Sequence, residues 1–295
     1  MTRRTITDYD PELLSLFDRY VHGFLTRRQF FDRAAKFAVG GVTVAALVDS
    51  LSPNYAQAQQ VAPDDARLIA AHVEYPSPQG AGTMRGYLVR PADASGAVPG
   101  VVVIHENRGL NPYVEDVARR VGTAGFAAFA PDALFPLGGY PGNDDDGRAL
   151  QRERDRDEMV EDFIAAVGFL RNHEACNGTV GAVGFCFGGS MANTLAVRVP
   201  ELSAAVPFYG GQPDAMDVPQ IQAALMIHYG SLDERVNAGW PAYEAALRAN
   251  SKTYTMHMYE GAAHGFHNDS TPRFDEAAAA LAWERTIDFF NQTLR

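Results

Sequence analysis

The sequence has only two cysteines, Cys176 and Cys186, among its 295 residues. Two cysteines cannot build a disulfide framework or a cysteine-rich zinc site. The sequence also lacks an excess of positive charge, because 25 Lys and Arg residues stand against 36 Asp and Glu residues, a net charge of −11. Nucleic acid and anionic membranes need a basic face on their partner, so neither is an expected partner.

Long apolar runs are missing as well, since no stretch reaches the roughly 20 residues of a membrane-spanning helix. Hydrophobic residues make up 46% of the chain and charged residues 21%, which is typical of a globular protein with a sizeable core. The arrangement of apolar and polar residues along the chain changes once, near residue 65. We therefore divide the chain into an N-terminal extension, 1–65, and one domain, 66–295.

The N-terminal extension allows two interpretations. Residues 10–24 carry apolar side chains at helical spacing, which predicts a helix. The arginine pair 27–28, the short apolar stretch 37–48 and the small-residue site 56–58 follow in the order of a twin-arginine signal. On that interpretation the protein meets the twin-arginine export machinery and is periplasmic. The alternative is a helical arm that packs on the domain and stays attached to a cytoplasmic protein.

Strand-like and helix-like patterns alternate through the domain. Strands are expected at 68–75, 84–90, 98–104, 126–130, 180–184, 204–209, 223–229 and 254–259, and helices at 113–124, 148–171, 188–198, 239–250 and 276–291. This alternation predicts an α/β fold, with a mostly parallel sheet covered by helices on both faces. The connection 131–147 is rich in Pro, Gly and Asp, and a loop of that length is often part of a site.

The sharpest motif is Gly184-Phe185-Cys186-Phe187-Gly188, between an expected strand and an expected helix. It has the form of a nucleophile elbow, in which glycines permit a tight turn, with Cys in the usual place of Ser. A single cysteine is more often a buried apolar side chain. The strand–turn–helix context instead favours Cys186 as a nucleophile, with the backbone N–H of Phe187 directed at an oxyanion.

A thiol nucleophile needs a base and an acid that orients the base, each after a later strand. Asp233 follows the strand that ends at residue 229, and His264 follows the strand that ends at residue 259. These positions predict His264 as the base and Asp233 as the acid. Glu234 is the rival acid, and His267 is the rival base or an ordinary core or surface histidine.

The expected strand 98–104 is followed by Glu106-Asn107-Arg108, where this kind of fold supplies a second oxyanion donor. The backbone N–H near Asn107 is the candidate donor. Glu106 either hydrogen-bonds the resting thiol or caps a helix or forms a salt bridge. Arg108 either binds an anionic group of the substrate or is a solvated loop charge.

From about residue 68 onward the chain resembles the dienelactone hydrolases (carboxymethylenebutenolidases), which are Cys-His-Asp enzymes of the α/β-hydrolase fold. The resemblance rests on the elbow at Cys186 together with Glu106, Asp233 and His264. It implies that Glu106 holds the resting thiol until substrate displaces it. Family members bind a substrate carboxylate partly through an Arg shortly after the His, whereas here the next Arg is Arg273. We therefore expect neutral esters or lactones to be hydrolysed at least as well as dienelactone-like anions.

The expected reaction is hydrolysis of a small ester or lactone through a thioester on Cys186. No metal or organic cofactor is expected, because no clustered carboxylates or cysteines accompany His264 and His267. Two alternatives remain. One is an acyl hydrolase acting on thioesters or peptide-like substrates, and the other is a non-catalytic redox or binding protein in which Cys186 is oxidised or pairs with Cys176.

Overall fold

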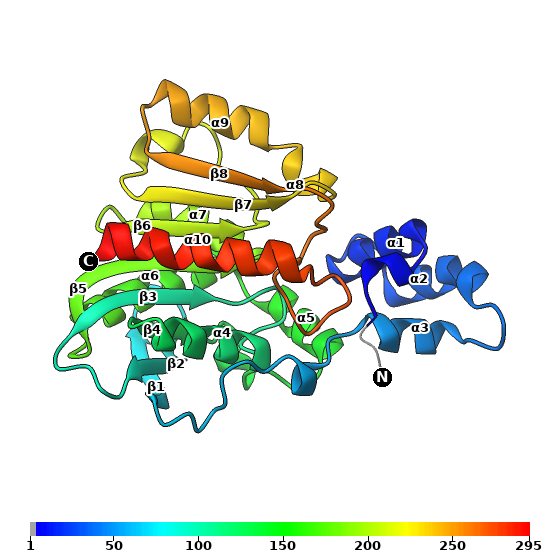
Figure 1. The fold of residues 1–295 in the computed structure, drawn as a ribbon, viewed down its shortest axis with the longest axis horizontal. Coiled ribbons are helices and arrows are strands. Elements are labelled where there is room, and N and C mark those ends of the chain that lie inside the picture. The colour runs from blue at the N-terminus through cyan, green and yellow to red at the C-terminus, as the bar shows by residue number, and fades with distance from the viewer. Residues whose placement is uncertain (1–3) are drawn as a thin grey trace.

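A single eight-stranded sheet forms the centre of the computed structural model, which describes residues 4–295 (Figure 1). Its strands are β1 (Leu68–Ser77), β2 (Gly82–Pro91), β3 (Val98–Ile104), β4 (Ala127–Pro131), β5 (Cys176–Phe185), β6 (Ala204–Phe208), β7 (Ala224–Gly230) and β8 (Tyr254–Tyr259). They lie in the order β1-β2-β4-β3-β5-β6-β7-β8. The β1–β2 and β2–β4 pairs are antiparallel and the remaining pairs are parallel, so the predicted mostly parallel sheet is confirmed.

Helices cover both faces of this sheet. Those of the domain are α4 (Pro112–Thr123), α5 (Asp144–Glu153), α6 (Arg156–Asn172), α7 (Phe187–Arg198), α8 (Glu234–Asn237), α9 (Trp240–Ala249) and α10 (Glu276–Leu294). Apolar residues of α6, α7 and α9 pack in one buried core, and those of α4 and α10 pack in a second core across the sheet. Two cores separated by a sheet are what a strand buried on both faces requires.

The helix expected at 148–171 is wrong as a single element, because it is broken between α5 and α6. Asp155 leaves the helical conformation and caps α6, its side chain accepting hydrogen bonds from the backbone N–H groups of Asp157 and Glu158. Arg154, in the break between α5 and α6, fixes this turn of the chain by donating hydrogen bonds to the Ala133 carbonyl and to Asp162. The loop expected at 131–147 ends at residue 144, where α5 begins, and α5 therefore lies beside the carboxyl ends of the strands.

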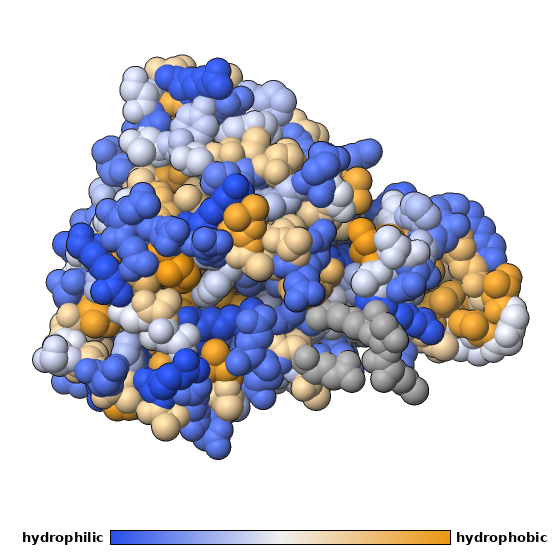
Figure 2. Space-filling model, in the orientation of Figure 1, coloured by the Kyte–Doolittle hydropathy of each residue, from blue (hydrophilic) through white to orange (hydrophobic). Residues whose placement is uncertain are grey.

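The N-terminal extension folds as a small helical lobe built from α1 (Pro11–Val21), α2 (Arg27–Ala34) and α3 (Val44–Leu51). We call residues 5–51 the N-terminal lobe. It has an apolar core of its own and lies beyond the carboxyl ends of the parallel strands (Figure 1). Figure 2 shows apolar surface at its outer end, and its exposed large hydrophobic residues include Phe24 and Val39. Among the described residues, no helix is both long enough and apolar enough to span a bilayer.

Candidate active site

Cys186 occupies a strained turn between β5 and α7. Its φ of 57° and ψ of −110° lie where non-glycine residues are rare. The turn requires the glycines around it, because a Cβ on Gly184 would collide with the carbonyl oxygen of Gly188, and a Cβ on Gly188 would collide with that of Ile104. Phe187 is the first residue of α7, so its N–H has no acceptor within the helix. The turn therefore presents a side chain and a free N–H at the same edge of the sheet.

His264 and Asp233 lie on the loops after β8 and β7, as the sequence predicts. His264 Nδ1 is 2.5 Å from Asp233 Oδ2, and both side chains are buried. The rivals lie elsewhere. His267 is buried against Phe185 and bonds the Tyr113 hydroxyl at 2.7 Å, whereas Glu234 is exposed on α8. The structure thus brings His264, and not His267, together with Asp233.

The second nitrogen of His264 faces the thiol. Nε2 is buried without a hydrogen-bond partner among the described residues, and His264 and Cys186 offer ligand atoms within 4.8 Å of each other. Burial opposes ionisation of Cys186, but the positive charges of His264 and His22 outweigh it and lower the thiol pKa to about 5. Burial likewise opposes protonation of His264, yet Asp233 and Cys186 raise its pKa to about 10. A thiolate beside an imidazolium is therefore the favoured state at neutral pH.

Glu106 and Arg108 form a buried ion pair after β3. Glu106 Oε2 accepts hydrogen bonds from Arg108 and from Asn268 Nδ2, the latter at 2.7 Å. Burial raises the pKa of Glu106, but nearby Arg108 and Arg273 outweigh burial and hold it below its usual range. No hydrogen bond joins Glu106 to Cys186 in the described part of the chain. The contact with the resting thiol that the family resemblance implies is thus not present in this conformation.

Arg108 lines the small cavity beside Cys186, and its binding of substrate stays a prediction. Its guanidinium is 5% exposed and spans Glu106 and Asp144, with Nη1 2.6 Å from Asp144 Oδ2. Because Arg108 is buried and paired with two carboxylates, the alternative of a solvated loop charge is wrong. Asn107 lies between these residues, and its side-chain Nδ2 donates to the Val21 carbonyl at 2.8 Å. This segment therefore connects the domain to the N-terminal lobe.

A cavity of about 440 Å³ opens beside Cys186. The described residues that line it include no acidic side chain but five arginines: Arg148, Arg152, Arg154, Arg156 and Arg235. Arg152 and Arg156 are exposed to solvent. The other three are paired with carboxylates, Arg148 with Asp145, Arg154 with Asp162 and Arg235 with Asp18. The side chains that line the cavity are thus basic, although the protein as a whole has a net charge of −11. An anionic group is attracted to such a cavity.

Arg273 also reaches the site, although it lies nine positions after His264 in the sequence. The loop after His264 folds back on itself, with the Asp275 N–H donating to the Phe266 carbonyl at 3.0 Å. Arg273 consequently lines a small cavity together with Glu106, Cys186 and His264. An arginine therefore does lie near the histidine, because spacing along a loop does not give distance in space.

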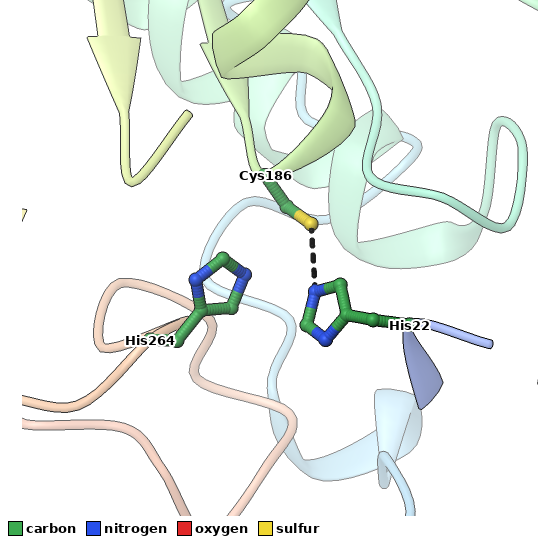
Figure 3. A group of neighbouring side chains, drawn as sticks. All are labelled: His22, Cys186 and His264. Carbon is green, nitrogen blue, oxygen red and sulfur yellow. Dashed lines mark hydrogen bonds between the residues drawn. The ribbon is translucent and has the colours of Figure 1, made fainter. Parts of the chain in front are cut away.

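His22 is the residue that sequence reasoning missed. It directly follows α1 in the N-terminal lobe, and its Nε2 lies 3.4 Å from Cys186 Sγ (Figure 3). Its ring also meets the His264 ring edge-on, with centroids 4.7 Å apart. The contact with Cys186 joins residues 164 positions apart, and no local pattern in the sequence marks it.

Three potential metal ligands meet in this cluster. One donor atom each from His22, Cys186 and His264 lie within 4.8 Å of one another, although the sequence led us to expect no metal site. The thiol lies within hydrogen-bond distance of His22, and Asp233 holds the far side of His264. Hydrogen bonding and charge account for this arrangement, so we interpret the cluster as the environment of a nucleophile.

Cys176 lies at the opposite end of β5 from Cys186. A strand rises about 3.3 Å per residue, so ten residues of β5 separate the two thiols by roughly 30 Å. A disulfide needs Cα atoms within about 7 Å. The alternative in which Cys186 pairs with Cys176 within one chain is therefore incompatible with this fold.

An elbow after β5, an acid after β7 and a histidine after β8 of a mostly parallel sheet define the chain as an α/β-hydrolase. The sequence profile of the dienelactone hydrolase family matches residues 84–294, and the chain belongs to that family. A second profile, described as YqhI-like, matches residues 1–36 within the N-terminal region.

Individual relatives agree with this assignment. The Escherichia coli protein named "Putative hydrolase fragment YghX" is 60% identical over 114 residues, which cover 39% of this chain and 97% of that protein. A Bradyrhizobium protein named "Probable 2-oxo-3-(5-oxofuran-2-ylidene)propanoate lactonase" is 31% identical, over 68% of this chain and 86% of its own. A crystal structure described as a putative dienelactone hydrolase from Klebsiella pneumoniae superposes with a TM-score of 0.66 at 25% identity, covering 76% of this chain and 99% of the other. The chain is thus a hydrolase of ester or lactone substrates.

Proposed function

We propose that this protein hydrolyses an ester or lactone by covalent catalysis, with Cys186 as the nucleophile. The observation that carries the proposal is the strained elbow, which holds Cys186 against the buried His264–Asp233 pair. A strained nucleophile beside a base that is itself oriented by a carboxylate is the arrangement that acyl transfer needs. His264 is the base, and Asp233 fixes its tautomer.

The reaction has two stages, acylation of Cys186 and hydrolysis of the resulting thioester. The Cys186 thiolate attacks the carbonyl carbon, forming a C–S bond, and the N–H groups of Phe187 and Asn107 stabilise the oxyanion. The C–O bond then breaks, and His264 gives its proton to the departing alkoxide, which in a lactone stays tethered as the hydroxyl of the opened ring. Water next attacks the thioester while His264 takes a proton from it. The C–S bond breaks, the acid is released, and thiolate and imidazolium return.

The substrate proposed for this site carries a carboxylate near the scissile bond. Support comes from the five arginines of the 440 Å³ cavity and from Arg273 beside the histidine. Charge-assisted hydrogen bonds of this kind contribute about 1.5–3 kcal/mol each when they are shielded from water. The lactonase name of the Bradyrhizobium relative is in keeping with a lactone that bears an acidic group.

The test of the chemistry follows p-nitrophenyl acetate turnover and the mass of the intact protein in the same samples. We expect an acetyl adduct on Cys186 during turnover, with both adduct and turnover lost in Cys186→Ala. Cys186→Ser should keep only a small fraction of the activity, because an alcohol is not deprotonated by a site built for a thiolate. Full activity in either variant contradicts the mechanism. A thioester panel run alongside decides whether another acyl hydrolase activity exceeds ester cleavage.

Export by the twin-arginine route is a separate proposal that rests on the arginine pair and the small residues around Ala58. In the folded protein Arg27 begins α2 and Ala58 is buried, so cleavage at this position requires the segment to leave the domain. Cell fractionation with an antibody against the hydrolase domain tests export. A protein that remains full-length in the cytosol contradicts it.

A further inference from the structure

Two carboxylate–histidine pairs meet at one sulfur. On the domain side, Asp233 holds His264. On the lobe side, His22 Nδ1 lies 2.8 Å from the backbone carbonyl oxygen of Asp18 and 3.2 Å from its carboxylate, and His22 Nε2 lies 3.4 Å from Cys186 Sγ. Asp18 and His22 are four positions apart at the end of α1, so they face the same way. Asp233 holds Nδ1 of His264 through its carboxylate, whereas Nδ1 of His22 bonds the Asp18 backbone carbonyl with the Asp18 carboxylate beside it. In both cases Nε2 is left for the thiol, and Figure 3 shows the two rings on either side of Cys186.

The lobe is fixed at the site by specific bonds. Its Val21 carbonyl accepts from Asn107, and its Tyr20 hydroxyl and Arg27 bond Asp145 at 2.8 and 3.0 Å. Behind this face, Leu13 and Phe17 are buried in the lobe's own core. The residues next to His22 are therefore bonded to the domain on one side and packed in the core of the lobe on the other. This fixes the position of His22, as catalysis requires of a group that acts on a substrate.

His22 does not close the site. The 440 Å³ cavity beside Cys186 is lined by His22 itself, with the lobe in place. An inhibitory plug fills the space that substrate needs, whereas here the lobe supplies one wall of that space. This difference favours a working role for His22 over an autoinhibitory one.

We propose that Asp18 and His22 form a second carboxylate–histidine pair acting on Cys186, which makes the N-terminal lobe part of the active site. The inference rests on the proposed role of Cys186 as nucleophile. His22 is then a catalytic residue that hydrogen-bonds the resting thiolate. It keeps a cationic partner beside the sulfur in the two states in which the sulfur is anionic, the resting thiolate and the thiolate that leaves when the C–S bond of the thioester breaks.

The charges around His22 agree with this role. Burial opposes its protonation, but Cys186 and Asp18 outweigh burial and raise its pKa. Other charged residues line a small cavity together with His22: Glu106, Arg108, Arg148 and Arg273. Two further groups contact its ring directly, His264 and Arg235, whose Nη2 lies 3.3 Å from His22 Nε2. Both cations oppose protonation of His22 and favour ionisation of Cys186. Cys186 first and Asp18 second raise the pKa of His22, and the Asp18 carboxylate also lies 3.8 Å from Arg235 and 3.7 Å from Arg273.

The experiment measures how the rate of Cys186 alkylation by iodoacetamide depends on pH in the full-length protein, with EDTA present to remove stray metal ions. His22→Asn and Asp18→Asn should raise the midpoint of alkylation by about one to two pH units, the equivalent of one charge-assisted hydrogen bond to the thiolate. Asp18→Asn should have the smaller effect, because it keeps the imidazole. His72→Asn is the matched control, since His72 pairs with Glu115 at 3.1 Å on edge strand β1.

Hydrogen exchange of residues 10–25 reports whether the lobe stays docked in each variant. Tyr20→Phe loses one docking bond but keeps His22, and it should leave the midpoint unchanged. An unchanged midpoint in His22→Asn with the lobe still docked overturns the inference, as does an equal shift in Tyr20→Phe. Alkylation reports on the thiol whether or not it is the nucleophile, and hydrolysis surviving in Cys186→Ala would overturn the proposed function alone.

Discussion

The two cysteines lie at opposite ends of the same strand, and the protein treats them in opposite ways. Their exposed fractions are nearly equal, 8% for Cys176 and 9% for Cys186. Burial raises the pKa of the Cys176 thiol, and no charged group among residues 4–295 is a cause that offsets it. For Cys186 the same burial is outweighed by two imidazoles, and the pKa falls to about 5. Burial alone therefore does not decide whether a thiol is reactive.

The difference comes from which edge of the sheet each thiol occupies. All the loops that follow parallel strands meet at the carboxyl edge, so Asp233, His264 and Glu106 gather there from three strands. Cys176 begins its strand at the other edge, where Gly100 and Leu170 are its neighbours. The reactivity of a thiol in this protein should therefore depend on the edge of the sheet at which it lies.

Replacing the two cysteines one at a time should give the largest contrast. Cys186→Ala removes the nucleophile and should lower kcat/KM for p-nitrophenyl acetate by about a thousandfold or more. Cys176→Ala removes a buried sulfur far from the site and should leave kcat/KM near the wild-type value. Equal losses in the two variants, with both folded by circular dichroism, would mean that position on the strand does not set reactivity.

Labelling across pH should separate the two thiols next. Because the pKa of Cys186 is about 5 and that of Cys176 is raised, iodoacetamide should modify Cys186 alone between pH 6 and 8. The rate at which iodoacetamide alkylates Cys186 should rise through pH 5 and stay level until His264 loses its proton near pH 10. Peptide mass spectrometry gives both rates. Labelling of Cys176 at pH 6 would remove the contrast.

The charge of the carboxyl edge should appear in substrate preference. Arg152→Ala and Arg156→Ala should each lower kcat/KM for a carboxylate-bearing lactone by about threefold to tenfold, because both side chains are exposed and screened. A matched neutral lactone should be little affected, and added salt should reduce the preference for the anion. A neutral substrate hydrolysed as well as the anion at low salt would restore the expectation drawn from sequence.

The smallest effect is expected from Glu106→Gln. The amide keeps the shape and the contact with Asn268, and Arg108 keeps Asp144, so the fold should be unchanged. Loss of one negative charge near the thiolate should lower the alkylation midpoint of Cys186 by less than about one pH unit. A profile identical to that of the wild type counts against any role for Glu106 at the thiol.

Local patterns in the sequence predict most of the domain. The buried strands, the elbow at Cys186 and the positions of Asp233 and His264 after their strands depend on neighbouring residues and on the rules of parallel sheets. The break before Asp155 was missed because the apolar spacing continues through it, and a capping side chain decided the outcome. Periodicity describes the face of a helix and says little about where a helix ends.

The errors at the site have a different origin. The placement of His22, the return of Arg273 and the pairing of Arg108 with Asp144 all depend on contacts between segments that are separate in the chain. A single sequence records the residues of such a pair but not their proximity. The N-terminal extension was interpreted as a leader or an arm on its composition, and nothing in its composition indicates that its single histidine, His22, meets the elbow.

The docking of the lobe sets the order in which a growing chain can complete its catalytic centre. Translation produces α1 first, so Asp18 and His22 leave the ribosome before any of their partners. Cys186 follows much later, and Arg235, His264 and Arg273 are made after it. The lobe has its own core and can fold early, but its inner face stays uncovered until the last strand and the loop after it are in place. A nascent chain therefore holds half of this centre ready throughout synthesis and acquires a reactive thiol only at the end.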